Sequence, residues 1–422
     1  MASVEENFGL NELEVPQWLN ADFIKKILQN CENDNDIEIE RLNFSPATSR
    51  DEHYASVMFR ANVSYKCIKS GSNKIKSLII KTLPEYESNK KEMLQDSPIF
   101  ETEIGMYSKV LPKLESMLRA VGDRTVFTAN CLYHSLNPKK VIVFEDLIPL
   151  GYMAIRDREV TLDEVKMAYL KLAKFHATSL KLLQEQPAAL DDIRYGAMTM
   201  TSWIESDFFS NGMSRFISAL DVTPTLVKYK PYFVAMKKDL IENCKKSFNE
   251  YRNNRQDNGI YAVCHGDFHF KNMLFKHNPT NNKLEDILCC DFQLSYVGSI
   301  ANDIIYSFYM LLMAEHRANH FDELLYYYFT HFTETLKKIG YNGRIPKLME
   351  LREQLLRHRH NAIYMLTTFL PFWYAYTLKK VDPDELMSAK DDSRDVLYTN
   401  KDYIKELHTI LPRYLELGYL EN

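Results

Sequence analysis

The fold is decided by the stretch VCHGDFHFKNMLF, residues 263–275, which is followed by CDFQ at residues 290–293. Phosphoryl transfer from ATP requires an aspartate that orients the attacking hydroxyl and accepts its proton, together with hard oxygen ligands for Mg²⁺. Asp267 fits the first role, whereas Asn272 and Asp291 fit the second, in the Asp-x-x-x-x-Asn spacing of a kinase catalytic loop. A turn and an ordinary strand end would explain either motif alone. Two motifs in this order, each beside a predicted strand, favour an ATP-dependent kinase.

A lysine and a glutamate upstream of these motifs are the candidates for binding the ATP phosphates. Lys81 ends an apolar strand, and a solvated sheet face is the ordinary explanation for such a lysine. The helix expected over residues 99–117 carries Glu103 on an otherwise apolar face, where a buried carboxylate needs a partner. We therefore predict a Lys81–Glu103 pair that directs the ammonium toward the phosphates, although Lys76 and Glu101 are near competitors.

The N-terminal part is predicted to form a mostly antiparallel sheet with a leading helix and one packed helix. Residues 20–30 have the apolar spacing of an amphipathic helix, and residues 57–66 alternate apolar and polar side chains as a half-buried strand does. A turn at residues 71–73 leads to a strand at 78–81, so these two strands are expected to form a hairpin. Two more strands are predicted, over residues 126–132 and 141–144.

The later part of the chain has helical patterns. Thr161 and Glu164 form a capping box at the start of a helix that runs to about residue 183. Short strands at 261–265 and 287–291 are expected to flank the catalytic motifs. Further helices are predicted over residues 203–220 and 226–251 and from residue 302 onward.

These patterns predict an α+β, protein-kinase-like fold of two lobes. Residues 1–143 would form the N-terminal lobe, residues 144–152 the hinge, and residues 153–422 a helical C-terminal lobe with the catalytic loop and the acceptor site. An extended hinge exposes backbone groups that can pair with adenine, and Glu145 and Leu147 are the candidates. A strand end followed by a turn would explain the same residues equally well.

Two residues are expected to support the catalytic loop. His265 is predicted to bond to the metal-binding segment. Asp303 is either a charge at a helix terminus or a buried carboxylate that holds the backbone around residues 265–267. His176 lies on a predicted helix and is expected to be structural.

Composition narrows the function classes. The formal net charge is −5 with no long basic run, which gives no support to nucleic-acid binding. The seven cysteines lack paired spacing, so no disulfide partner and no zinc site are expected. Residues 1–10 do not have the pattern of a signal peptide, and a cytoplasmic location is expected. The uncharged residues 362–378 are predicted to form a buried helix rather than a membrane span.

Seven blocks together resemble the ecdysteroid kinase-like family of insects, which is related to choline and aminoglycoside kinases. The blocks are VPQWL at 15–19, YASVMFR at 54–60, TEIGMY at 102–107, FEDL at 144–147, LAKFHA at 172–177, the loop at 265–275 and DFQ at 291–293. The resemblance implies dependence on ATP and Mg²⁺. It also implies phosphorylation of ecdysteroid alcohols, with a wider role on hydroxylated foreign compounds.

The sequence departs from the family pattern at two places. Residues 47–53 contain no glycine, and Asp51 stands where the family usually has one, next to the expected triphosphate. Ser49, Arg50 or backbone N–H groups are the candidates to compensate. His269 stands where the family often carries an aromatic residue such as tryptophan.

The function favoured by these residues is phosphorylation of a small-molecule alcohol. An acceptor pocket is expected between the catalytic loop and the late helices, although ordinary helix packing also explains each of its candidate residues. Those candidates are His269, Tyr306, Phe369, Phe372 and Trp373. A choline- or ethanolamine-type kinase is one alternative, because aromatic residues bind quaternary ammonium groups. A catalytically silent small-molecule-binding homologue is another. A protein kinase is disfavoured because no Ala-Pro-Glu segment follows Asp291.

Overall fold

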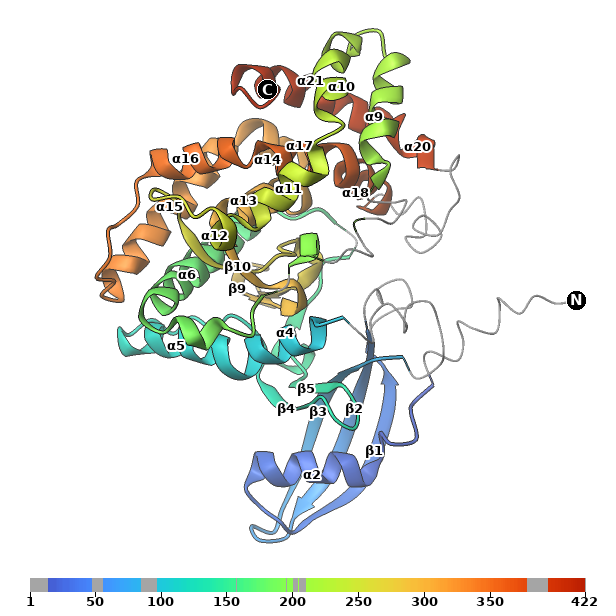
Figure 1. Ribbon diagram of the computed structural model, residues 1–422. Helices are drawn as coiled ribbons and strands as arrows, with labels where there is room; N and C mark the ends of the chain where they lie inside the picture. The colour runs from blue at the N-terminus through green and yellow to red at the C-terminus, as the bar shows by residue number, and fades with distance from the viewer. Residues whose placement is uncertain are drawn as a thin grey trace, which may run out of the picture.

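The chain folds into two lobes, a sheet-containing N-terminal lobe and a mostly helical C-terminal lobe (Figure 1). This is the α+β, protein-kinase-like architecture that the sequence predicts. The computed structural model describes residues 14–47, 56–84, 97–156, 158–194, 196–199, 204, 210–377 and 394–421. The predicted ATP-loop residue Ser49, with Arg50 and Asp51, lies outside the described residues.

The N-terminal lobe is built on a five-stranded antiparallel sheet in the order β1-β2-β3-β5-β4. The strands are β1 (Ile37–Pro46), β2 (Val57–Cys67), β3 (Ser72–Thr82), β4 (Cys131–Ser135) and β5 (Val141–Glu145). Helix α2 (Ala21–Glu32) lies across the sheet, with Ile24, Ile27 and Leu28 buried against it (Figure 1). The leading helix and the β2–β3 hairpin are confirmed, although Ser72 and Asn73 belong to β3 and not to the turn.

The predicted strand over residues 126–132 is wrong for its first five residues. The backbone of Phe127 is bound elsewhere, because its N–H donates to Glu115 and its carbonyl accepts from the Cys289 N–H. A segment whose backbone groups are used in this way cannot pair along β5. The strand that does pair with β5 is β4, which begins at Cys131.

The predicted helix 99–117 is present in three pieces. These are α4 (Ile99–Gly105), a π-helical turn (Met106–Val110) and α5 (Leu111–Ala120). Pro112 lacks an N–H and its ring would collide with the carbonyl four residues earlier, which explains the wider turn before it. Glu103 lies on α4 and is 1% exposed.

Residues 144–152 connect the sheet to the helical lobe. Strand β5 ends at Glu145, and a 3₁₀ turn (Ile148–Leu150) and Gly151, with φ of +87°, lead into the short strand β6 (Tyr152–Met153). The lobe limits and the hinge function of this segment stay predictions.

The C-terminal lobe starts with α6 (Leu162–Glu185), and the predicted capping box of Thr161 and Glu164 is confirmed. Four short strands follow: β7 (Tyr261–Cys264), β8 (Met273–His277), β9 (Leu284–Cys289) and β10 (Tyr296–Ser299). Strands β7 and β10 pair with each other, and β8 pairs with β6 and β9. The sequence predicts β7 and β9 but misses β8 and β10.

Helices make up the rest of this lobe. The predicted helix 203–220 is confirmed over α9, which begins at Gly212, whereas residues 203 and 205–209 lie outside the described residues; the predicted helix 226–251 is divided into several short helices. Their bounds are α9 (Gly212–Asp221), α10 (Lys230–Met236), α11 (Leu240–Phe248), α12 (Glu250–Asn253), α13 (Ile300–Met310), α14 (Ala314–Asn319), α15 (Phe321–Lys338), α16 (Leu348–Arg357), α17 (Arg359–Tyr364), a π-helical turn (Met365–Phe369), α18 (Leu370–Thr377), α20 (Asp395–Tyr398) and α21 (Lys401–Glu416).

The uncharged stretch near residue 362 packs inside the protein. Ala362, Ile363, Leu366 and Leu370 are buried in the main core, as predicted. Among the described residues, no helix has the length and apolar character needed to cross a membrane. The seven cysteines are free thiols.

Candidate active site

The catalytic loop, residues 265–272, runs from the end of β7 to the start of β8. It begins with a turn that requires glycine, because Gly266 has φ of +82° and a Cβ there would lie 2.2 Å from the Leu294 carbonyl oxygen. Leu294 belongs to the segment that follows Asp291. The two motifs found in the sequence therefore pack directly against each other.

Asp303 holds the start of this loop from helix α13. Its carboxylate accepts hydrogen bonds from the backbone N–H of His265, at 2.6 Å, and of Gly266, at 3.0 Å. His176 Nε2 lies 3.1 Å from the same carboxylate, and its Nδ1 lies 2.6 Å from the Tyr328 hydroxyl. Of the two explanations for Asp303, the buried carboxylate that holds the loop is therefore confirmed. His176 is buried and structural, as predicted, with Asp303 as its partner.

His265 joins the loop to the second motif. Its Nε2 lies 3.1 Å from the Cys290 carbonyl oxygen, and its Nδ1 accepts from the Asp267 N–H at 3.3 Å. The predicted bond from His265 to the proposed metal-binding segment is thus present. Burial lowers the pKa of His265, although Asp303 and Asp267 act in the opposite direction.

The β8–β9 hairpin brings the two proposed metal ligands to one end. Met273 is opposite Cys289 in this hairpin, and the Cys290 N–H donates to the Asn272 carbonyl at 2.9 Å. Asn272 immediately precedes β8, and Asp291 lies two residues beyond the end of β9. The hairpin register therefore places residues that are 19 positions apart in sequence next to each other.

The Asp267 carboxylate is held on both oxygens. Asn272 Nδ2 donates to Oδ2 at 2.9 Å, and the Tyr306 hydroxyl donates to Oδ1. His269 Nε2 lies 3.3 Å from Oδ1. Burial acts to raise the pKa of Asp267, but His269, Tyr306 and His265 outweigh it and lower the pKa to about 2. Asp267 is therefore ionised and can accept a hydrogen bond from an alcohol.

Lys81 lies between two carboxylates. Its Nζ is 2.7 Å from Glu103 Oε2 and 2.6 Å from Asp291 Oδ1, so it joins the sheet, helix α4 and the second motif. The near competitors have other partners, because Glu101 pairs with Lys140 and Lys76 lies 4.0 Å from Glu32.

The Lys81 cluster has an excess of negative charge. Burial raises the pKa of Glu103 to about 7, with Lys81 opposing and Asp291 adding to the rise. Burial acts to lower the pKa of Lys81, but Asp291 and Glu103 outweigh it and raise that pKa. One ammonium therefore serves two carboxylates.

Gln293 is a member of this cluster that the sequence analysis missed. Its Oε1 accepts from Lys81 at 3.3 Å, and its Nε2 donates to Asp291 Oδ2 at 3.2 Å. The side chain thus joins the cation to the proposed metal ligand. Its position two residues after Asp291 was the available signal, since a polar side chain there lies close to the same cleft.

The side-chain oxygens of Asn272 and Asp291 suit a hard divalent cation. Asn272 uses its Nδ2 to bind Asp267, and within the described residues no hydrogen bond is made to its Oδ1. Asp291 has a side chain that is 27% exposed, and its backbone has φ of +64°, a strained conformation for a residue with a Cβ. An amide oxygen and a carboxylate at one hairpin end match the oxygen ligands that Mg²⁺ prefers.

The predicted hinge residues have side chains that face away from these groups. The Glu145 carboxylate accepts from Asn130 N–H and Nδ2, and the Leu147 carbonyl accepts from Leu150 and Tyr152. Both residues line a cavity of about 580 Å³ that does not include Lys81. The Glu145 N–H also donates to the Asn130 carbonyl, so, within the described part of the chain, the Glu145 carbonyl and the Leu147 N–H are the backbone groups left for the expected contact with adenine.

Three of the five predicted acceptor residues lie together. The ring centroids of His269 and Tyr306 are 6.4 Å apart, and those of Tyr306 and Phe369 are 6.2 Å apart, so an aromatic group adjoins Asp267. Trp373 instead lines a separate, larger cavity of about 1150 Å³. Phe372 is half-buried and lines neither cavity.

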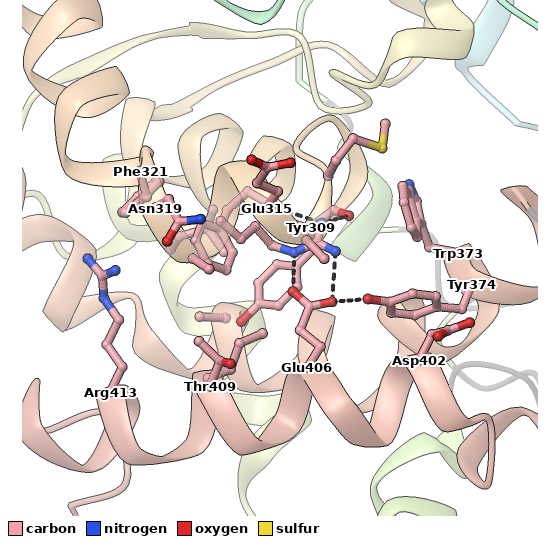
Figure 2. Close-up of a pocket in the computed structure, with 18 of the residues that line it drawn as sticks. Tyr309, Glu315, Asn319, Phe321, Trp373, Tyr374, Asp402, Glu406, Thr409 and Arg413 are labelled. Atoms are coloured by element: carbon pink, nitrogen blue, oxygen red, sulfur yellow. Dashed lines mark hydrogen bonds and ion pairs between the residues drawn. The ribbon is translucent and has the colours of Figure 1, made fainter. Parts of the chain in front are cut away.

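The larger cavity lies between the catalytic loop and the C-terminal helices. Phe270 and Lys271 of the loop and Ile305 of α13 contribute to its lining. Figure 2 shows Asp402, Glu406, Thr409 and Arg413 of α21 along one wall and Trp373 and Tyr374 at one end. A buried ion pair of Arg317 with Glu406 lines the cavity, and the Tyr374 hydroxyl donates a hydrogen bond to the Glu406 carboxylate.

The two lobes, the loop between β7 and β8 and the Lys81 cluster define the class of protein as a kinase. The chain belongs to the ecdysteroid kinase-like family, whose model matches residues 50–341. It is therefore a small-molecule phosphotransferase by family. No curated protein is a significant match to the chain.

Several solved structures of small-molecule kinases are similar to this chain over most of their length. A microcompartment-associated aminopropanol kinase has a TM-score of 0.43 and 13% identity, covering 95% of this chain and 99% of its own. An amicoumacin kinase in complex with AMP-PNP and Ca²⁺ has a TM-score of 0.38 and 12% identity, covering 92% and 94%. A choline kinase from Streptococcus pneumoniae has a TM-score of 0.37 and 11% identity, covering 92% and 98%.

Proposed function

We propose that this protein uses ATP and Mg²⁺ to phosphorylate an alcohol group of a small hydrophobic molecule, such as an ecdysteroid or a hydroxylated foreign compound. The observation that carries the proposal is the hairpin end where Asn272 and Asp291 meet, with Lys81 bound to Asp291 and Asp267 bound to Asn272. The proposal includes the lobes at residues 1–143 and 153–422 and the hinge at residues 144–152.

Each side chain would perform one part of the transfer. Asp267 would accept a hydrogen bond from the acceptor hydroxyl and take its proton as the oxygen attacks the γ-phosphorus. Lys81, positioned by Glu103, would neutralise charge on the phosphates. Asn272 and Asp291 would hold Mg²⁺, which when bound neutralises the charge that develops on the phosphate oxygens. Leu147 and Glu145 would bind adenine through their backbone.

The larger cavity adjoins the catalytic loop but is not lined by Asp267, His269 or Tyr306, so it would hold the body of the acceptor rather than its reacting hydroxyl. Sites for small molecules usually occupy about 300–1,000 Å³, and this cavity of about 1150 Å³ has room for a fused-ring molecule (Figure 2). Its lining contains Phe308, Tyr309, Trp373 and Tyr374. Six Lys or Arg and four Asp or Glu side chains also line it, a balance that disfavours the cationic acceptor of a choline-type kinase.

The test is incubation with ATP, Mg²⁺ and a panel of ecdysteroids and hydroxylated aromatic compounds, read by the mass gain of one phosphate. Wild type is expected to phosphorylate at least one compound of the panel. Asp267→Asn, which keeps the shape of the side chain, should lose this activity by roughly 10²–10⁴-fold. A fully active Asp267→Asn variant would exclude Asp267 as the base.

A catalytically silent binding protein is the competing explanation. ATP with Mg²⁺ should raise the unfolding midpoint of wild type, because a ligand stabilises the state that it binds. Asp291→Ala should reduce that rise. Equal midpoints with and without the nucleotide, in both proteins, would favour the silent binder.

A further inference from the structure

Tyr306 places its hydroxyl on the Asp267 oxygen that the proposed reaction uses. The hydroxyl donates to Oδ1, whereas Asn272 holds Oδ2. His269 Nδ1 accepts from the Lys271 N–H at 3.2 Å, so a neutral His269 carries its proton on Nε2, which lies 3.3 Å from the same Oδ1. A carboxylate oxygen has about two lone-pair positions, and both positions of Oδ1 are therefore used.

The position of this hydroxyl is built into the fold. Tyr306 lies one helical turn after Asp303 on α13, so the two side chains share a face of the helix. Asp303 is bound to the backbone of His265 and Gly266, which fixes α13 relative to the catalytic loop. The Tyr306 ring also adjoins Phe369 edge-on, with centroids 6.2 Å apart. Helix α13 thus holds three successive loop residues: Asp303 binds His265 and Gly266, and the Tyr306 hydroxyl binds Asp267.

The Tyr306 hydroxyl makes the contact that an acceptor alcohol has to make. The attacking and leaving oxygens lie roughly in line on opposite sides of the transferred phosphoryl group, so the acceptor approaches from the side away from the nucleotide. Oδ2 keeps one lone-pair position, but it is bound to Asn272, the proposed metal ligand, and so lies on the side of the metal and the nucleotide, whereas Oδ1 is the oxygen on the acceptor side. A phenol and an alcohol are equivalent hydroxyl donors toward a carboxylate.

We propose that Tyr306 is a specificity-determining residue whose hydroxyl occupies the acceptor position on Asp267 until an alcohol displaces it, and so excludes water from the base. This inference rests on the proposed kinase function. Its consequence is a preference for transfer to an alcohol over hydrolysis of ATP.

The reaction that Tyr306 suppresses is simple hydrolysis. The oxygen of a water molecule bonds to the γ-phosphorus while the bond from that phosphorus to its bridging oxygen breaks. The electron pair of that bond leaves with ADP, and the proton of the water goes to Asp267. The products are ADP and inorganic phosphate, and no other reactant is required.

The experiment measures phosphate release from ATP and Mg²⁺ without any acceptor. Tyr306→Phe keeps the ring and removes the hydroxyl, so hydrolysis should rise about five-fold or more, the equivalent of one lost hydrogen bond. Adding Asp267→Asn to this variant should abolish the gain. Tyr65→Phe is the matched control, because its hydroxyl binds Glu32 at 2.6 Å in the N-terminal sheet, and hydrolysis should stay at the wild-type rate.

Unchanged or slower hydrolysis in folded Tyr306→Phe would overturn the inference while leaving the proposed kinase intact. Tyr306→Leu is a second variant, which should also release phosphate faster if it remains folded. For any acceptor that the panel identifies, Tyr306→Phe should lower KM for the alcohol, because no hydroxyl has to be displaced. If ATP with Mg²⁺ neither stabilises wild type nor is turned over by any variant, the proposed function fails and this inference with it.

Discussion

Glu103 and Glu250 are both buried glutamates with a basic partner, but their surroundings act on them in opposite directions. Glu103 is 1% exposed and pairs with Lys81, and its pKa is raised to about 7. Glu250 is 5% exposed and accepts hydrogen bonds from Arg357, His358 and Tyr261. Burial acts to raise the pKa of Glu250 also, but His358 and Arg357 outweigh it and lower the pKa to about 2.

Burial and charge count both differ: burial is the largest influence on the pKa of Glu103, which is the more deeply buried glutamate, and its cation is shared with a second carboxylate. Lys81 has two carboxylate partners, Glu103 and Asp291, so this cluster has more negative than positive charge. Glu250 is the single carboxylate of its cluster and has all its donors in place. A buried group with surplus charge is destabilising unless a further ion binds, whereas a satisfied group only holds the fold together. We infer that the first cluster is built to receive a cation and that the second is structural.

The largest effect is expected from Asp291→Asn. It removes the surplus charge and one proposed metal ligand, so phosphate transfer should fall roughly 10³-fold, as expected when several kcal/mol of charge stabilisation are lost. The free energy of unfolding without ligand should not fall. Asp221→Asn is the control, because Asp221 is an exposed partner of Lys230 and lines neither cavity, and its activity should equal wild type. A stable Asp291→Asn protein with full activity would contradict the inference that the Lys81 cluster receives a cation.

Glu250→Gln should have the opposite pattern. Breaking a buried pair leaves Arg357 without its charged partner and should lower the free energy of unfolding by about 3 kcal/mol. Turnover per folded molecule should stay near the wild-type value. Denaturant unfolding and activity measured on the same preparation separate the two quantities. A large loss of turnover with normal stability would show that Glu250 takes part in catalysis and would contradict its assignment as a structural residue.

Glu103→Gln tests the other carboxylate of the functional cluster. The amide keeps the shape of the side chain but weakens its hold on Lys81, so transfer should fall roughly 10-fold to 100-fold. Because Lys81 retains Asp291 as a partner, unfolding at pH 8 should not become easier. Steady-state kinetics in ATP should show the loss, and wild-type kinetics would argue that Lys81 needs no second anchor.

The last effects are expected in the pH dependence of stability, and each can reach about 3 kcal/mol, because a pKa shift of one unit is equivalent to about 1.4 kcal/mol. Folded Glu103 binds its proton more tightly than the unfolded chain does, so its stabilising contribution is lost as pH rises from about 4.5 through 7. Folded Glu250 binds its proton less tightly, so its contribution is lost as pH falls from about 4.5 through 2. Unfolding curves of Glu103→Gln and Glu250→Gln should each be flatter than wild type in the corresponding range only.

Much of the site could be predicted from the sequence because it is local. Asp267 and Asn272 belong to one loop, and their proposed roles follow from residue type and spacing. The Lys81–Glu103 pair could be predicted because a carboxylate on an apolar helix face has to find a cation. The support from Asp303 was one of two alternatives, since a helix start gives no sign of what its carboxylate binds.

The remaining features depend on contacts that spacing does not encode. Strands β7, β8 and β10 are only four or five residues long, too short to show a period of their own, and β7 could be predicted only because it leads into the catalytic motif. The direction of the Tyr306 side chain is set by α13 packing on the loop, and a tyrosine in an apolar helix otherwise suggests core packing. Gln293 was missed for a similar reason, because its bond to Lys81 spans 212 residues.

The most direct test of the account is a crystal structure with Mn²⁺ and a non-hydrolysable ATP analogue, read by anomalous scattering. The account predicts a manganese peak bonded to the side-chain oxygens of Asn272 and Asp291, with the Lys81 ammonium on the nucleotide phosphates. Manganese or nucleotide bound at another place, with Asn272 and Asp291 making no contact to either, would contradict it.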